Sequence, residues 1–262
     1  MVVNRNFAVY EKDTGLELIN ISLNNAFLPG SNGDPRVVWD QHSGRWIVMN
    51  TDFDDEIFLA VSLTGDPTGS WFKTSFDITQ GPDSGGFPDY PTLGVDEDGI
   101  YVTAYVVSND AMTIWAIDKA PLIDPTPSLG TITAFRSLPF EWAIQPVHTY
   151  GTPGPQYFIS TPGNSSLRVR ALNKPITSPS LVTVASPFVP FKDFPPNAPA
   201  LGSGTPINTV DIRLMNAVYR DGFIYAANNI SENGRAAVRW YKVEAATGTV
   251  DESGIIADSQ LY

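Results

Sequence analysis

The sequence predicts an all-β fold class in which short antiparallel strands form four-stranded sheets. Short apolar runs, rich in β-branched and aromatic residues, alternate with turns rich in Gly, Pro, Asp and Ser. The pattern repeats, because Trp46, Tyr101 and Tyr157 lie in similar runs that are 55 and 56 residues apart. No segment of ten or more residues has the apolar period of an amphipathic helix. Since consecutive four-stranded meanders are the repeating unit of β-propellers, the predicted fold is a β-propeller.

The clearest repeat lies between Asp34 and Ile78. An acidic loop separates its second and third apolar runs, and the turn Asp66-Pro67-Thr68-Gly69 leads to the fourth. The strands expected in this blade are residues 37–39, 46–49, 57–61 and 71–76. Links this short join antiparallel neighbours, so the four strands form one sheet.

Three further blades follow the same plan. The second is expected at residues 92–95, 100–107, 112–117 and 132–135, the third at 145–150, 157–160, 167–172 and 181–185, and the fourth at 210–219, 223–228, 236–243 and 250–256. A long proline-rich connection, residues 187–206, separates the third blade from the fourth.

The N-terminal region supplies half a blade. Residues 7–10 and 16–19 read as two strands, and the stretch 10–15 resembles 241–248, so this half provides the third and fourth strands of its blade. We therefore expect a single β-propeller domain over residues 1–262, five blades by count with the N-terminal blade incomplete. We also expect the chain to be a fragment of a longer one.

The aromatic residues divide into two predicted groups. Trp46, Tyr101 and Tyr157 occupy equivalent positions in the repeat and are expected to be buried between blades. Trp142 lies in the link before the third blade and is the candidate for an exposed platform, since a ring face suits the C–H face of a sugar.

Composition excludes several classes of function. The net charge is −12, so the chain offers no basic patch for nucleic acid or anionic membranes. It has no cysteine, which excludes disulfides and thiol catalysis. No apolar run is long enough to span a bilayer, so no membrane insertion is expected. The oligomeric state is left open.

Polar residues stand where the inner strand of each blade begins. In a propeller these strands line the central channel, so residues at their starts face one mouth of it. The predicted ligand-binding residues are Asp34, Asp89, Tyr90, Gln145, Asp211 and Arg213. Paired carboxylates are what glycoside hydrolysis requires, whereas at each residue taken separately a turn cap is the simpler interpretation. No catalytic residue is assigned.

No cofactor is expected from the sequence. The acidic loop at residues 52–56 offers oxygen ligands for calcium, with a solvated loop as the favoured alternative. The two histidines, His42 and His148, are too few for a multi-histidine metal site. A structural role for His148 is favoured over a serine triad, because no nucleophile-elbow motif is present.

Four stretches carry a resemblance to known proteins. The sequences at residues 33–35, 62–71, 89–95 and 213–218 resemble a group of uncharacterised bacterial extracellular β-propeller domains. The resemblance implies a secreted or cell-surface location and no particular reaction. The expected shape is also similar to five-bladed glycoside hydrolases and sialidases, which is an analogy of fold alone. The sequence therefore predicts a module that binds a glycan or a protein partner, with a glycosidase-like enzyme as the alternative and a structural module of a surface protein as a third possibility.

Overall fold

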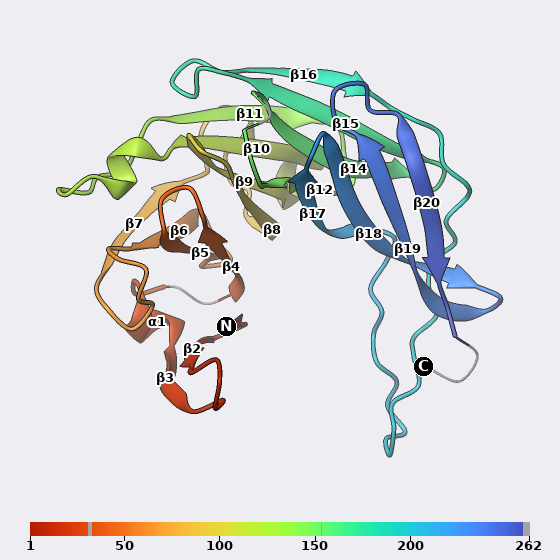
Figure 1. Cartoon of the computed structure of the whole chain (residues 1–262), viewed down its shortest axis with the longest axis horizontal. Coiled ribbons are helices and arrows are strands. Elements are labelled where there is room, and N and C mark those ends of the chain that lie inside the picture. The colour runs from red at the N-terminus through yellow and green to blue at the C-terminus, as the bar shows by residue number, and fades with distance from the viewer. Residues whose placement is uncertain (31–32, 153, 259–262) are drawn as a thin grey trace. The chain divides into compact units, whose positions relative to one another are not determined.

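The computed structural model describes residues 1–30, 33–152 and 154–258, and its regular structure is almost entirely β (Figure 1). Helical structure in these residues is limited to α1 (Leu23–Ala26) and the 3₁₀ turns η1 (Gly81–Asp83), η2 (Val107–Asn109) and η3 (Ala120–Ile123). Four of the sheets in this part of the chain contain an antiparallel meander of four strands. The predicted fold class, an all-β propeller of about five blades, is confirmed.

The strands of the described residues group into five sheets. The N-terminal sheet holds β1 (Val2–Val3), β2 (Asn6–Tyr10) and β3 (Glu17–Ser22). The β4–β7 sheet holds β4 (Gly33–Asp40), β5 (Arg45–Thr51), β6 (Glu56–Ser62) and β7 (Trp71–Asp77). The β8–β11 sheet holds β8 (Pro88–Val95), β9 (Gly99–Val106), β10 (Ala111–Asp118) and β11 (Ile132–Leu138). The β12–β16 sheet holds β12 (Trp142–Pro146), β14 (Gln156–Gly163), β15 (Ser166–Asn173) and β16 (Ser180–Ala185). The β17–β20 sheet holds β17 (Leu214–Arg220), β18 (Phe223–Glu232), β19 (Arg235–Glu244) and β20 (Val250–Ile256), with the short β13 (His148–Thr149) beside β17.

The chain divides into two compact units. The first unit, residues 1–140 and 175–179, contains the N-terminal, β4–β7 and β8–β11 sheets. The second unit, residues 141–174 and 180–262, contains the β12–β16 and β17–β20 sheets. The assignment of residues 1–262 to one propeller domain stays a prediction.

In the first unit the β4–β7 sheet is buried on both faces. Ile47, Met49 and Leu59 pack in a cluster with residues of β9 and β10. The alternating residues Val48 and Ala60 pack on the opposite face, in a cluster with β2 and α1. Because both faces are covered, the central strands β5 and β6 carry continuous apolar runs instead of alternating with polar residues.

Three aromatic rings fasten the N-terminal sheet to β7. Phe7, Phe27 and Trp71 contact one another edge to face, with ring centroids 5.3 to 5.7 Å apart. Such pairs add stabilisation beyond the area that they bury. The short helix α1 places Phe27 in this trio, because the hydroxyl of Ser22 accepts a hydrogen bond from the Asn25 N–H and caps the helix.

A buried ion pair joins the β4–β7 and β8–β11 sheets. The Nζ atom of Lys119, just after β10, lies 2.8 Å from Oδ2 of Asp40, and both side chains are almost completely buried. The same ammonium group donates a hydrogen bond to the carbonyl oxygen of Asp96. Removing one partner would leave a buried charge unpaired, which typically costs about 3–5 kcal/mol.

The second unit has a core of its own between two sheets. Tyr157, Ile159 and Val169 of the β12–β16 sheet share a cluster with Ile224 and Tyr241 of the β17–β20 sheet. The burial of Tyr157 in this core agrees with the sequence prediction, and Tyr101 is fully buried in the first unit.

Three details of the sequence prediction are wrong. Trp46 is only partly buried, because it lies near the β4–β5 turn. There its Nε1–H donates to the carbonyl of Gly65, and its ring packs at a tilt against that of Trp39, with centroids 5.1 Å apart. The short strand β1 pairs with β2, so the N-terminal sheet has a strand before residue 7. The strand expected at 145–150 is two strands, since β13 leaves the β12–β16 sheet and pairs in parallel with β17.

The proline-rich connection, residues 187–206, contains no named helix or strand, as its composition predicts. It is tied to the β14–β15 turn, where the N–H of Lys192 donates to the carbonyl of Asn164 at 2.8 Å and Nδ2 of Asn164 donates back at 2.7 Å. The Nζ atom of Lys192 donates to the carbonyl of Ser166 at 3.0 Å. Arg239 of β19 donates to the carbonyls of Pro190 and Phe191. Two cationic side chains thus hold the connection against the second unit.

Within the described residues, no helix has the length and apolar composition needed to cross a bilayer.

The core of each unit can be tested by truncation. Met49 and Ile159 are fully buried, and Met49→Ala or Ile159→Ala should each lower the free energy of unfolding by about 2–5 kcal/mol. Leu63→Ala, which removes an exposed side chain, is the control and should change it by less than about 0.5 kcal/mol. Scanning calorimetry should give one transition that both core variants shift. Two transitions, each shifted by one variant, would contradict the single-domain prediction.

Lys192 should make the stability of the protein depend on pH. Burial, with a smaller contribution from the charge of Arg239, lowers the pKa of Lys192 to about 8. Between this value and the ordinary 10.5, the unfolded chain binds a proton that the folded chain does not, so the free energy of unfolding rises with pH through this window. Urea denaturation at about pH 7 and about pH 9.5 should show this rise in the wild type relative to Lys192→Met, whose side chain does not titrate. The same pH dependence in both proteins would refute the assignment.

Candidate functional site

The inner strand of each full blade is interrupted near its start by a β-bulge. The register shifts lie between Gly33 and Arg36 in β4, Asp89 and Thr92 in β8, Trp142 and Ile144 in β12, and Leu214 and Asn216 in β17. Bulges of this kind redirect side chains and are common beside binding sites.

Three of these bulges contain a residue other than glycine with left-handed backbone. The φ angles are 45° at Asp34, 48° at Tyr90 and 50° at Ala143. The bulges therefore place Asp34, Tyr90 and Ala143 at equivalent positions. Asp89 lies one residue before the left-handed position that Asp34 and Tyr90 share, and Gln145 lies two residues beyond Ala143.

In the first unit, Arg36 links the starts of β4 and β8. Its guanidinium carbon lies 4.9 Å from the centre of the Tyr90 ring, and its Nε–H donates to the carbonyl of Pro91 at 3.0 Å. The cation and the ring attract each other, and the hydrogen bond fixes the direction of the guanidinium group. Asp34, two residues before Arg36, is partly exposed on the same segment.

Phe53, in the loop between β5 and β6, is a site residue that sequence reasoning missed. Its ring fills the space above Gly33, where a Cβ atom would lie 1.9 Å from two ring carbons. Its φ angle is 64°, a rare conformation for a bulky residue, and its side chain is 48% exposed. The sequence feature that could have pointed to Phe53 is its place as a single aromatic residue among the acidic residues Asp52, Asp54 and Asp55.

The acidic loop around Phe53 is held by its own backbone. Oδ1 of Asp52 accepts hydrogen bonds from the N–H groups of Asp54 and Glu56 at 2.8 and 3.1 Å. Partial desolvation, and then the charges of Asp54, Asp52 and Asp77, raises the pKa of the Asp55 carboxyl. In the described ranges, no group of three or more His, Cys, Asp or Glu side chains is arranged to hold a metal ion. Calcium binding by this loop stays untested.

Asp89 is exposed and stands directly across from Tyr105 in the β8–β9 pairing. The Tyr105 hydroxyl donates to Oδ1 of Asp110 at 2.9 Å, and its ring contacts that of Phe140 edge to face at 5.4 Å. The hydrogen bond to Asp110 is the main cause that raises the pKa of Tyr105, and the charge of Asp89 adds to it. Asp89 is thus an exposed carboxylate beside aromatic side chains.

The remaining predicted residues, Gln145, Asp211 and Arg213, belong to the second unit. Asp211 and Arg213 form a two-pronged ion pair, with Nε–Oδ1 and Nη2–Oδ2 distances of 2.8 and 2.5 Å. Gln145 is buried, and its Nε2 donates to the carbonyl of Leu214 at 2.6 Å. The Gln145 bond joins β12 to the first residue of β17, whereas the Asp211–Arg213 pair lies within the segment just before β17. That the residues of both units face one channel mouth stays a prediction.

A buried carboxylate that the sequence did not reveal stands just before β12. Glu141 is 1% exposed and receives hydrogen bonds from both Nη atoms of Arg170 at 2.8 and 2.6 Å. Arg168 and Ser160 also donate to it. The hydrogen bonds that Glu141 accepts come from β14 and β15 of the same sheet, so this buried carboxylate organises the strands beside the start of β12.

The two histidines and Trp142 each have a neighbour that helps to hold them in place. The backbone N–H of His42 donates to Oδ1 of Asp40 at 3.0 Å within the β4–β5 turn. The His148 ring contacts that of Tyr150 edge to face at 4.8 Å. Trp142 lies in β12 instead of a link, and its ring is partly covered by an edge contact with Phe194 at 5.5 Å.

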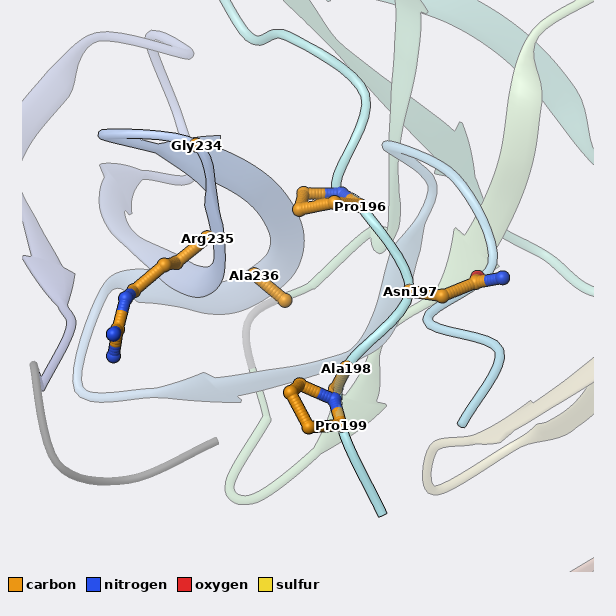
Figure 2. Close-up of a pocket in the computed structure, with 7 residues that line it drawn as sticks. All are labelled: Pro196, Asn197, Ala198, Pro199, Gly234, Arg235 and Ala236. Carbon is orange, nitrogen blue, oxygen red and sulfur yellow. The ribbon is translucent and has the colours of Figure 1, made fainter. Parts of the chain in front are cut away.

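A pocket of about 200 Å³ lies between the proline-rich connection and the β18–β19 turn (Figure 2). Figure 2 shows the rings of Pro196 and Pro199 and the methyl group of Ala236 around this space, whereas the side chains of Asn197 and Arg235 are directed away from it. The pocket wall is therefore mainly apolar, and the predicted site residues do not line it.

Comparisons with known proteins give similarity to solved structures only. No protein-family model matches the chain, and no curated protein matches it significantly. It is similar to a bifunctional GH43-CE protein of Bacteroides eggerthii, with a TM-score of 0.46 and 13% identity over 85% of this chain and 27% of that one. The catalytic domain of a GH62 α-L-arabinofuranosidase of Coprinopsis cinerea has a TM-score of 0.40 and 13% identity over 83% of this chain and 66% of its own. An engineered GH43 glycoside hydrolase with endo-xylanase and exo-arabinofuranosidase activity has a TM-score of 0.40 and 12% identity over 86% of this chain and 39% of its own. Similarity this distant carries no information on activity or substrate.

The bulge in β12 can be tested with glycine. Ala143→Gly should leave the free energy of unfolding within about 0.5 kcal/mol of the wild type, because relief of the left-handed backbone offsets the lost methyl group. Ala171→Gly, at a similarly buried position in β15 of the same sheet, should lower it by at least about 1 kcal/mol. Denaturant titration measures both values. Equal losses in the two variants would show that the bulge stores no strain.

Proposed function

We propose that the chain is an extracellular β-propeller module that binds a glycan at the starts of β4 and β8. The observation that carries this proposal is the exposed ring of Phe53, held in left-handed backbone above Gly33. Asp34 and Tyr90, which have the same unusual conformation, lie on the strands beside it. Strained backbone persists only where the surrounding structure enforces it, and it is concentrated at functional sites.

The chemistry of these side chains suits a sugar. An exposed aromatic ring offers an apolar face to the C–H groups of a pyranose. Carboxylates such as Asp34 and Asp89 accept hydrogen bonds from hydroxyl groups. The guanidinium of Arg36 is already oriented by the Tyr90 ring and the Pro91 carbonyl, so it donates to a ligand with little loss of side-chain freedom.

The negative charge of the chain restricts the class of glycan that this site can bind. The chain carries a net charge of −12, and carboxylates outnumber cations in the loop beside Phe53. A polyanionic sugar would be repelled, so the ligand is uncharged. The secreted or cell-surface location belongs to this proposal and rests on the sequence resemblance.

A protein partner and a glycosidase-like reaction are the competing functions. A protein partner would use a wider surface than the one around Phe53, since specific protein interfaces typically bury about 800 Å² on each partner. Hydrolysis would require a carboxylic acid and a second carboxylate on either side of the scissile bond, for which Asp34 and Asp89 are the candidates in this unit. The same set of variants distinguishes the three functions.

The test begins with a glycan array probed with the purified protein, followed by calorimetric titration of the best glycan. Phe53→Ala should weaken binding at least about ten-fold, which corresponds to about 1.4 kcal/mol. Asp34→Asn and Asp89→Asn should each weaken it less, because an amide retains one acceptor oxygen. Glu97→Gln is the matched control, since Glu97 is exposed in the β8–β9 turn at the other end of the hairpin that carries Asp89.

The outcomes separate the three functions. Unchanged affinity in Phe53→Ala would refute the glycan site. An array without a hit, together with capture of a protein that Phe53→Ala fails to bind, would favour a protein partner. Release of reducing sugar by the wild type, abolished in Asp34→Asn or Asp89→Asn, would establish the glycosidase-like alternative.

A further inference from the structure

A shallow groove of about 400 Å³ lies on the β17–β20 sheet. The pairs Val218–Tyr225 and Ala227–Trp240 are in register across β17, β18 and β19, so these side chains share one face of the sheet. The alternating residues Ala217, Ala226 and Tyr241 point the other way and belong to the core of the second unit. We call the face with Tyr225 and Trp240 the aromatic groove.

Trp240 lies along the sheet instead of standing out from it. Its cross-strand partner on β20 is Gly254, and a Cβ atom at Gly254 would lie 2.8 to 2.9 Å from Nε1, Cε2 and Cζ2 of the indole. The ring therefore occupies the space that a side chain at position 254 would need. One ring face is covered by β20, and the side chain as a whole is only partly buried.

Tyr225 extends the same surface. Its direct partner on β19 is Lys242, so Trp240 is its diagonal neighbour, at a separation of roughly 7–8 Å in antiparallel sheets. Tyr225 is 39% exposed. Two aromatic side chains on adjacent strands thus provide a short apolar track along the sheet.

One lysine and two carboxylates lie near the track, and its rim is polar. Nζ of Lys242 lies 2.6 Å from Oδ2 of Asp251 and 4.1 Å from the centre of the Phe223 ring. Oδ1 of Asn216 accepts a hydrogen bond from the N–H of Ala217 at 2.8 Å, which orients its amide group at the edge of the groove. Glu252, the direct partner of Lys242 on β20, adds an exposed carboxylate. The groove therefore presents no net positive charge to a ligand, together with groups that bond to hydroxyls.

We propose that the aromatic groove is a second binding site, for an uncharged oligosaccharide whose sugar rings stack on Trp240 and Tyr225. The indole of Trp240 lies along the sheet, so its exposed face can stack on the C–H face of a pyranose. Lys242 is paired with Asp251 and therefore does not attract an acidic ligand. This site does not depend on the one proposed around Phe53, because its residues are on other sheets of the other unit.

The test titrates the protein with cellohexaose, xylohexaose and mannohexaose, and follows tryptophan fluorescence and binding heat. At least one hexaose should bind the wild type, and Trp240→Ala and Tyr225→Ala should each weaken that binding at least about ten-fold. Gly254→Ala should weaken it as well, because the added Cβ displaces the indole although both aromatic residues remain. Trp39→Ala is the matched control, since Trp39 is as exposed as Tyr225 and lies on β4 in the first unit.

The thermal midpoint of each variant shows whether it folds. If Trp240→Ala does not fold, Tyr225→Ala still tests the groove, because Tyr225 is at an exposed position. Absence of hexaose binding, or unchanged affinity in both Tyr225→Ala and Gly254→Ala, would overturn the proposal. A wild-type dimer in light scattering that becomes monomeric in Tyr225→Ala would assign the groove to a second copy of the chain and also overturn it. If Phe53→Ala loses affinity and Tyr225→Ala does not, the groove is refuted and the site around Phe53 is supported. If Tyr225→Ala loses affinity and Phe53→Ala does not, the groove is supported and the site around Phe53 is refuted.

Discussion

The structure depends on one constraint, which is that a four-stranded sheet cannot bury its own faces. Each sheet must place an apolar face against the next sheet, as Ile47 and Met49 do against β9 and β10, and as Tyr157 and Ile159 do against β18 and β19. Stability therefore comes mainly from contacts between neighbouring sheets, as in other repeat architectures. The same constraint makes the β4–β7 sheet apolar on both faces, because it has a neighbour on each side.

Buried charge pairs limit how the strands can be arranged, one of them between two sheets and the others at the margin of a single sheet. In the first unit Asp40 pairs with Lys119, and Asp83 accepts hydrogen bonds from Arg136 and from Thr113. In the second unit Glu141 pairs with Arg170. Desolvation offsets much of the attraction in such pairs, so they contribute little net stability. Any alignment that separates the partners leaves a buried charge unpaired, and the pairs therefore penalise incorrect alignments more than they stabilise the correct one.

Sequence reasoning succeeded where a single local pattern decides the structure. The strands at 57–61 and 100–107 were predicted because β-branched and aromatic runs between turn residues rarely form anything else. It failed where one extra residue changes the register. The bulges at Asp34, Tyr90 and Ala143 have no common residue type, so nothing in the sequence distinguishes them from regular strand. Phe53 was missed for a related reason, since its importance comes from Gly33 on a different strand. Burial of Glu141 depends on two arginines more than twenty-five residues away, which no local pattern reveals.

The outermost strands of the blades differ in how well they resist pairing with another molecule. An edge strand exposes unpaired backbone groups, and charged side chains are the usual protection against strand addition. β20 carries Asp251 and Glu252, β7 carries Lys73 and Asp77, and β11 carries Arg136. β16, with the sequence SLVTVA, has no charge and an exposed Val182. The β12–β16 sheet is therefore the one at which aggregation would begin, and a single lysine on β16 would be the smallest change that improves the solubility of the protein during purification.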